Sequence, residues 1–177
     1  MFGLNMVVNK GKTVFIADTT VHEYPSSKQL AEIAKSSARV VRLFGFDPKI
    51  AFLSHSTFGT PLTSRTKHIR DAVEILKEMK VDFKFDGDMQ PDVALNEDYK
   101  ELYPFSDIVG KANVLIMPGQ HSAAISYKIM KTLGGAKVIG PLLIGLGRAI
   151  EIAPLRSSTS DILNLASVAA YSSGVIN

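Results

Sequence analysis

Cysteine is absent from this chain of 177 residues. Its absence excludes disulfide bonds, thiolate metal ligands and a cysteine nucleophile, and it is compatible with a cytosolic protein. The four histidines, His22, His55, His68 and His121, show no ligand spacing such as HxxxH. We therefore expect no metal site in this chain.

Long apolar runs are also missing. The most apolar stretch, 138–152, is broken by glycine and proline and contains Arg148, so no membrane span is predicted. The N-terminus has no basic leader followed by an apolar run and a cleavage site, so we expect a cytoplasmic protein without a signal peptide. Lys and Arg form no runs and the net charge is only +3, which argues against nucleic-acid and membrane partners but fits an anionic small ligand.

Apolar residues make up 46% of the chain and charged residues 21%, which is enough to bury the core of one domain. Helical and strand patterns alternate along it. After a hairpin over 6–16, the predicted strands are 49–54, 83–86, 114–117, 138–140 and 149–152. The predicted helices are 27–44 behind a Ser26/Gln29 capping box, one through 69–76, 93–103, one through 125–129 that ends at 134–135, and 160–171. This order predicts an α/β fold with a mostly parallel sheet sandwiched by helices.

Two of the loops after predicted strands carry candidate ligand groups, since ligands of open α/β sheets bind at the strand ends. In the loop 54–60, Ser56 and Thr57 can coordinate a phosphate or an acyl oxygen; the alternative is an ordinary polar loop in which Thr63 or Ser64 caps the next helix. In the loop 117–122, His121 is a candidate general base, or a packed or capping group.

A third candidate loop, 154–161, runs into the last predicted helix. Ser158 and Asp161 form a capping box that leaves backbone N–H groups open to an anion, and Arg156 beside it can bind a phosphate in bidentate fashion. Capping alone is the alternative role. The pairs Gly134-Gly135 and Gly145-x-Gly147 do not form GxGxxG between a strand and a helix, so nicotinamide binding within this chain is not expected.

Several ordered motifs resemble the phosphate acetyl- and butyryltransferases. The segments are 82–94 (DFKFDGDMQPDVA), 110–118 (GKANVLIMP), 133–143 (LGGAKVIGPLL) and 160–166 (SDILNLA). The resemblance runs from about residue 11 to 171. It implies a phosphotransacetylase-like lobe, similar in architecture to the isocitrate and isopropylmalate dehydrogenases, with 1–177 as the second lobe plus a C-terminal helix.

Two departures from this family bear on activity. Active members carry Ser-Arg where this chain has Pro154-Leu155, so the groups that would hold the acyl carbonyl and the CoA or phosphate are missing. Only Asp161, whose counterpart is proposed as the base on the CoA thiol, remains. The family's transferases are also about twice this size, with two lobes lining one cleft. We therefore expect no catalytic residues and no acetyl transfer in the isolated chain.

The residues at 56–59 and 117–123, together with Pro154, resemble the C-terminal domain of large NADP-dependent malic enzymes. That resemblance implies N-terminal domains in cis that convert malate to pyruvate with NADP and a divalent cation. It also implies a homo-oligomer formed through this domain, with acetyl-CoA as an allosteric effector and no cofactor in the fragment itself. The expected acyl-CoA or phosphate site comprises Ser56, Thr57, His121, Arg156, Ser158 and Asp161. The alternatives are part of an active phosphate acetyltransferase, and an assembly module without a ligand.

Overall fold

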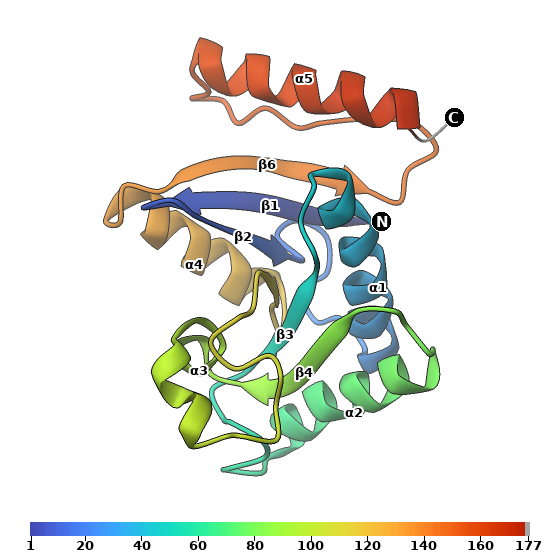
Figure 1. Ribbon diagram of the computed structural model, residues 1–177. Coiled ribbons are helices and arrows are strands. Elements are labelled where there is room, and N and C mark those ends of the chain that lie inside the picture. The colour runs from blue at the N-terminus through green and yellow to red at the C-terminus, as the bar shows by residue number, and fades with distance from the viewer. Residues whose placement is uncertain (176–177) are drawn as a thin grey trace.

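The computed structural model describes residues 1–175 and the side chains to Ser173. Figure 1 shows the arrangement of the elements. The strands are β1 (Phe2–Asn9), β2 (Lys12–Ala17), β3 (Lys49–Leu53), β4 (Lys84–Met89), β5 (Val114–Ile116) and β6 (Lys137–Ile144). The helices are α1 (Ser27–Leu43), α2 (Ser64–Glu78), α3 (Pro91–Leu95), α4 (Gln120–Thr132) and α5 (Thr159–Val175), with a short 3₁₀ helix η1 (Glu97–Glu101).

The strands form one six-stranded sheet in the order β4-β3-β5-β2-β1-β6. Neighbours from β4 to β2 are parallel, whereas β1 is antiparallel to both β2 and β6. Only β1 therefore runs against the others, which confirms the mostly parallel sheet expected from the sequence. The β1–β2 turn at Lys10-Gly11 has positive φ at both residues, as a tight hairpin requires.

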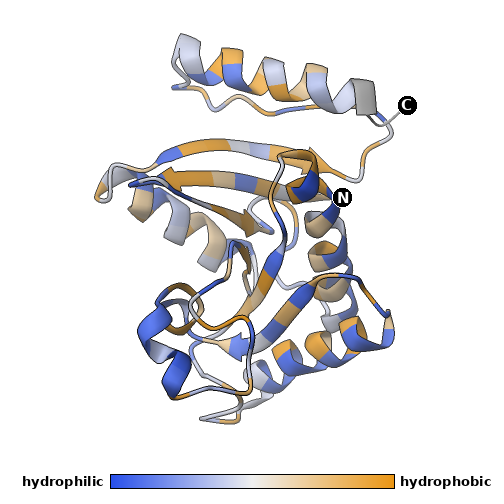
Figure 2. Cartoon of the chain, viewed as in Figure 1, coloured by the Kyte–Doolittle hydropathy of each residue, from blue (hydrophilic) through white to orange (hydrophobic). Residues whose placement is uncertain are grey.

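Helices cover both faces of this sheet, as predicted. Alternate strand residues point to opposite sides, so Ile50 and Phe52 of β3 pack under α1 and α2, while Ala51 and Leu53 pack under α3 and α4. Figure 2 shows the hydrophobic residues running along the central strands. Among residues 1–175, no helix has the length and apolar character needed to cross a membrane.

The capping signals in the sequence set the helix starts. Ser26 and Gln29 form the expected capping box at α1, and Thr63 caps α2 by accepting the backbone N–H of Thr66. The helix predicted over 93–103 is divided into α3 and η1. Asn96 interrupts it with an extended backbone, and its side chain accepts the N–H of Asp98.

The strand predicted at 149–152 is wrong. Only Glu151 forms a single bridge, to Leu142 of β6. Ile150 and Ile152 are 50% and 43% exposed, so a strand here has no apolar surface to bury. The segment instead returns along β6 and leads into α5, which lies beyond the β6 edge of the sheet (Figure 1).

Candidate functional site

The residues predicted to bind a ligand lie in three separate places. Arg156, Ser158 and Asp161 lie at the start of α5, Ser56 and Thr57 in the β3–α2 loop, and His121 at the start of α4. The structure therefore does not gather all six into one site.

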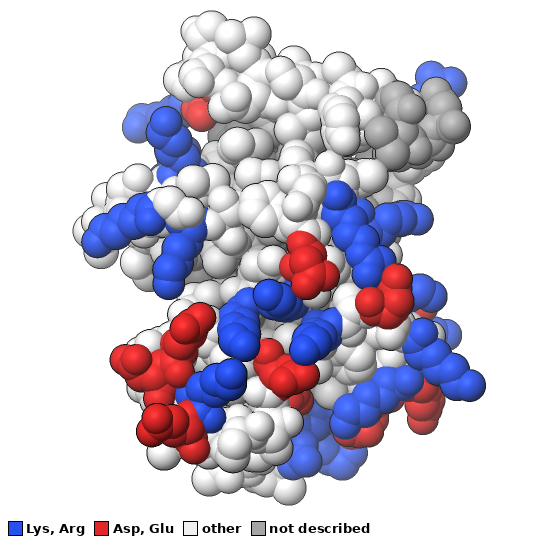
Figure 3. All heavy atoms as spheres, viewed as in Figure 1, with Lys and Arg blue, Asp and Glu red and all other residues white. Residues whose placement is uncertain are grey.

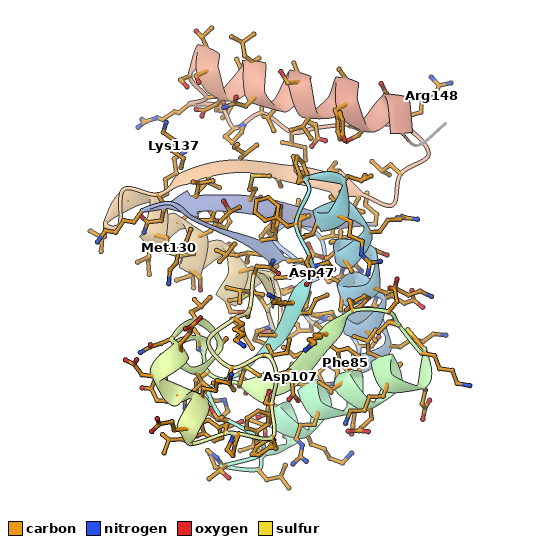
Figure 4. The ribbon with its side chains drawn as sticks, viewed as in Figure 1. Asp47, Phe85, Asp107, Met130, Lys137 and Arg148 are labelled. Atoms are coloured by element: carbon orange, nitrogen blue, oxygen red, sulfur yellow. The ribbon has the colours of Figure 1, made fainter. Side chains whose placement is uncertain are left out.

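The first place is a cavity of about 120 Å³ between α4, β6 and the loop that enters α5. Arg156 lines it and makes no ion pair within the part of the chain that the structure describes. Figure 3 shows Lys and Arg atoms gathered beside the N-terminal end of α5. Figure 4 shows Lys137, at the start of β6, on the side of the strand that faces α5. The lining of the cavity thus carries two basic side chains, Lys131 and Arg156, beside one carboxylate, that of Asp161.

Ser158 and Asp161 form the capping box that the spacing predicts. The Ser158 N–H donates to the Asp161 carboxylate at 2.9 Å, and the Asp161 N–H donates to the Ser158 hydroxyl at 3.2 Å. These hydrogen bonds from Ser158, the backbone one first, lower the pKa of Asp161, and Lys131 lowers it further. Asp161 therefore acts as the helix cap of α5 in this structure.

Pro154 and Leu155, which replace the expected Ser-Arg pair, provide no polar side chain. Pro154 lines the cavity and its carbonyl accepts both the N–H and the hydroxyl of Ser157, at 2.9 and 2.7 Å. The side chain of Leu155 is fully exposed. Arg156, one position further along, is the residue of this loop that brings a guanidinium to the cavity.

The second place, the β3–α2 loop, is held together internally. Ser56 is fully buried and its hydroxyl donates to the Asp88 carboxylate, which also accepts the N–H of Gly59 at 3.0 Å. The Thr57 hydroxyl accepts the N–H of Gln90 at 3.2 Å. Both predicted ligand groups therefore tie the loop to the end of β4, and neither reaches the Arg156 cavity.

His121, in the third place, pairs through Nε2 with the Glu23 carboxylate at 3.0 Å. It lines a larger, open cavity of about 710 Å³ between the starts of α1, α2 and α4, together with Tyr24, Arg65 and His68. The His68 ring is engaged by the Pro25 carbonyl and the Ser27 hydroxyl. The His121 side chain is 73% exposed, and among the described residues it hydrogen-bonds to no hydroxyl group.

Three residues of the Arg156 cavity do not emerge from the sequence reasoning. Tyr127 and Lys131 come from α4, and Asn164 comes from the second turn of α5. The i, i+4 spacing of Tyr127 and Lys131 places them on one helix face, which is a signal in the sequence. The sequence gives no such signal that Arg156 lies beside them, because that contact depends on how α4 and the α5 loop meet.

Another missed residue is Asp18, a buried carboxylate at the end of β2. It accepts the backbone N–H groups of Gly3, Thr20, Val21 and His22, and it contacts the His22 ring at 2.6 Å. Burial alone raises the pKa of Asp18, but these hydrogen bonds outweigh burial and leave the pKa below its usual value. Asp18 is therefore a structural anchor of the β2–α1 loop. Within residues 1–175 no cluster of three His, Asp or Glu residues can hold a metal ion.

Comparison with known proteins agrees with the geometry. Residues 1–170 match the family described as phosphate acetyl/butaryl transferase. The chain is 47% identical over 174 residues to the NADP-dependent malic enzyme of Rhizobium meliloti (strain 1021), covering 98% of this chain and 23% of that protein. It is 34% identical over 166 residues to the phosphate acetyltransferase of Bacillus subtilis (strain 168), covering 93% of this chain and 51% of that protein.

Solved structures agree with this match. The chain superposes on the crystal structure of a phosphotransacetylase from Streptococcus pyogenes with a TM-score of 0.93 and 32% identity, covering 98% of this chain and 54% of the other. The predicted phosphotransacetylase-like fold is thereby confirmed. The chain spans about a quarter of the malic enzyme and about half of the two transferases. Because the family match covers nearly all of it, this chain belongs to the phosphate acetyl/butaryl transferase family.

Proposed function

We propose that this chain is a non-catalytic regulatory and assembly domain of a malic enzyme. Its ligand in this proposal is acetyl-CoA or a related acyl-CoA, and the cavity beside Arg156 holds a phosphate of that ligand. The observation that carries the proposal is the loop 154–161. It presents the Arg156 guanidinium to the cavity, has no hydroxyl at position 154 where active members carry serine, and holds Asp161 in a capping box.

The size of the cavity supports binding of only part of such a ligand. Sites that enclose a whole drug-sized molecule measure roughly 300–1,000 Å³, whereas this cavity measures about 120 Å³. A phosphate group fits a recess of this size, and the two positive charges of Arg156 and Lys131 outnumber the one carboxylate in the lining, that of Asp161. The remainder of the acyl-CoA then lies on surface that the rest of a longer polypeptide completes.

The outer side of α5 supports a place within a longer polypeptide. After Asp161 this helix has no charged residue among the described ones, and Ile162, Leu163 and Tyr171 are 51%, 62% and 54% exposed. Of its side chains only Leu165 is buried in the core of the domain. A helix that exposes several large apolar side chains and no charge after its first turn is normally covered, so we assign its outer side to the upstream part of the parent protein.

The parent reaction, oxidation and decarboxylation of malate with NADP and a divalent cation, belongs in this proposal to upstream domains. In this chain Gly145 and Gly147 lie in the turn that follows β6, and no helix begins there to receive a pyrophosphate. We therefore place the NADP site of the parent in those upstream domains. Its contribution is binding and assembly.

Calorimetric titration of acetyl-CoA into the full-length parent protein tests the proposal. Replacing Arg156 by alanine removes a bidentate phosphate contact, so we expect affinity to fall by about tenfold or more. Arg148→Ala is the matched control, because Arg148 lies near the opposite end of α5 (Figure 4) and should leave affinity unchanged. Equal affinity of both variants and the wild type would remove Arg156 from the site, and absence of binding by the wild type would refute the ligand.

A kinetic measurement tests the regulatory part. If acetyl-CoA acts through this domain, it binds two states of the parent with different affinity and changes malate turnover. Arg156→Ala should then abolish the response to acetyl-CoA and leave turnover without effector near normal. A response that persists in the variant would contradict regulation through this cavity.

A further inference from the structure

The crevice outside β2 and β5 lies where the path of the chain divides. These strands are parallel neighbours, with residues 15–17 paired to 114–116. From the end of β2 the chain passes to α1 on one face of the sheet, and from the end of β5 it passes to α4 on the other face. Ligands of open α/β sheets bind in the crevice between two loops that diverge in this way, outside the carboxyl ends of the strands.

The cavity of about 710 Å³ that contains His121 occupies this crevice. This β2–β5 cavity is lined mainly by residues 23–26 after β2, by the segment 118–122 after β5, and by the first turns of α2. Its volume lies within the range of roughly 300–1,000 Å³ that small-molecule sites measure. Among the described residues, none lines both this cavity and the Arg156 cavity, which lies toward the other end of α4.

Arg65 gives the β2–β5 cavity a positive charge without a compensating partner. It lines the cavity and forms no ion pair within the part of the chain that the structure describes. Glu23 is the one carboxylate among the described lining residues, and the His121 Nε2 engages it at 3.0 Å. An anion that enters the cavity therefore meets an unpaired guanidinium, whose planar fork suits a phosphate.

The hydrogen bonds of His68 add to this positive charge. Its Nε2 lies 2.7 Å from the Pro25 carbonyl and its Nδ1 lies 2.8 Å from the Ser27 hydroxyl, which donates to the His68 carbonyl at 2.9 Å. A carbonyl only accepts, and the hydroxyl has one proton to give. All three hydrogen bonds therefore form together only when both ring nitrogens carry protons. In that state the ring is a cation held in place at the wall of the cavity.

Backbone donors lie beside these side chains. The N–H groups of Arg65, His121 and Ser122 belong to the first turns of α2 and α4 and donate to no backbone carbonyl within residues 1–175. First-turn N–H groups have no partner inside their own helix. A phosphate is a suitable acceptor for them, and the positive ends of the two helix dipoles favour it further.

Tyr24 adds a flat apolar surface to the same cavity. It is 82% exposed, and Pro25 and Pro118 line the cavity with it. A ring left open in this way offers a face on which a planar group of a ligand can stack. The cavity thus combines polar groups for an anion with an apolar surface, as small-molecule sites do.

We infer that the β2–β5 cavity binds a small organic phosphate with a planar apolar part. The phosphate lies between Arg65 and the starts of α2 and α4, and the planar part lies on the Tyr24 ring. The inference goes beyond the proposed function and does not depend on it, because the Arg156 cavity has a separate lining.

Ligand-observed NMR titration of the full-length parent protein with phenyl phosphate tests the inference. We expect saturable binding with a Kd of about 1 mM or lower, since this probe carries both a phosphate and a planar ring. Arg65→Ala, at an exposed position, removes the guanidinium and should weaken binding about tenfold or more. Tyr24→Ala should also weaken binding of phenyl phosphate but leave binding of inorganic phosphate unchanged, because only the ring of the probe contacts Tyr24.

Arg70→Ala is the matched control, because Arg70 is exposed on the same helix and lies outside the lining of the β2–β5 cavity. It should bind the probe as tightly as the wild type, as should Arg156→Ala, and saturating acetyl-CoA should leave the probe bound. No binding by the wild type, or equal binding by the wild type and Arg65→Ala, would overturn the inference. Loss of binding in Arg156→Ala, or displacement of the probe by acetyl-CoA, would overturn it too, by assigning the phosphate to the acyl-CoA site. Acetyl-CoA titration of the same variants reports separately on the proposed function.

Discussion

At the scale of single residues, the carboxylates of this chain have unequal roles. Asp161 is held by a reciprocal hydrogen-bond pair with Ser158, and its pKa is lowered. Glu151 is the opposite case, since its Oε2 is buried and has no hydrogen-bond partner among the described residues. Burial raises the pKa of Glu151 to about 7, and a hydrogen bond from the Leu143 backbone offsets this only in part.

The pKa of Glu151 makes a prediction for stability. A carboxyl whose folded-state pKa is raised favours folding when protonated, so its contribution is complete below its unfolded pKa of about 4.5 and is lost as the pH rises to about 7. Glu151→Gln should therefore be more stable than the wild type at pH 8, by about 1–2 kcal/mol after allowance for partial exposure. Urea unfolding at pH 5 and pH 8 measures this difference. Glu32→Gln, on the exposed side of α1, should show no such gain, and an equal gain in both variants would contradict the assignment.

The capping role of Asp161 also has a measurable consequence. Asp161→Ala removes the acceptor for the Ser158 N–H and should lower the free energy of unfolding. Urea unfolding measures the loss, with Glu78→Ala at the end of α2 as a control near zero. If Asp161→Ala leaves the free energy of unfolding unchanged, the carboxylate is not a cap in solution.

At the scale of elements, the sequence predicts best where a local interaction decides the structure. The α1 capping box, the Lys10-Gly11 hairpin and the α5 capping box depend on residues close in sequence, and all three are confirmed. The strand predicted at 149–152 is wrong for a tertiary reason, because no apolar surface beside β6 buries Ile150 and Ile152. The cavity likewise joins α4 to the α5 loop, and periodicity identifies the helix face with Tyr127 and Lys131 but not the loop that it meets.

Asp18 joins separate elements and provides a prediction at this scale. Its carboxylate connects the start of β1, through the Gly3 N–H, to the loop before α1. Because charged hydrogen bonds contribute about 1.5–3 kcal/mol, Asp18→Ala should lower the free energy of unfolding by about 3 kcal/mol or more. Asp18→Asn, which keeps one acceptor oxygen, should lose less. Thermal or urea unfolding at pH 7 ranks the variants, and the reverse order would contradict the anchor role.

The lowered pKa of Asp18 sets the direction of its pH dependence. Its stabilising contribution is present above the ordinary pKa of 3.8 and is lost as the pH falls through the lower folded-state value. Acid unfolding of the wild type should include this loss, and acid unfolding of Asp18→Ala should lack it. Identical acid transitions would show that the carboxylate is equally hydrogen-bonded in the unfolded chain.

At the scale of the whole molecule, the chain is a family lobe with an uncovered apolar surface on α5 and a small cavity lined by Arg156 and Lys131. The outer side of α5 is assigned to the upstream part of the parent. The fold and the family could be predicted from the ordered motifs, because these place strands, turns and helix starts in sequence. Which surfaces remain uncovered could not, since exposure depends on the packing of all the elements together.

The most direct test of binding without catalysis is thiol release from acetyl-CoA in the presence of phosphate, measured on the full-length parent protein. The Pro154-Leu155 pair provides neither a hydroxyl nor a guanidinium, and Asp161 is engaged as a cap, so we predict no release above the uncatalysed background at concentrations where calorimetry detects bound acetyl-CoA. Sustained release of thiol by the wild type, reduced in Arg156→Ala, would contradict the account and identify the chain as part of an active phosphate acetyltransferase.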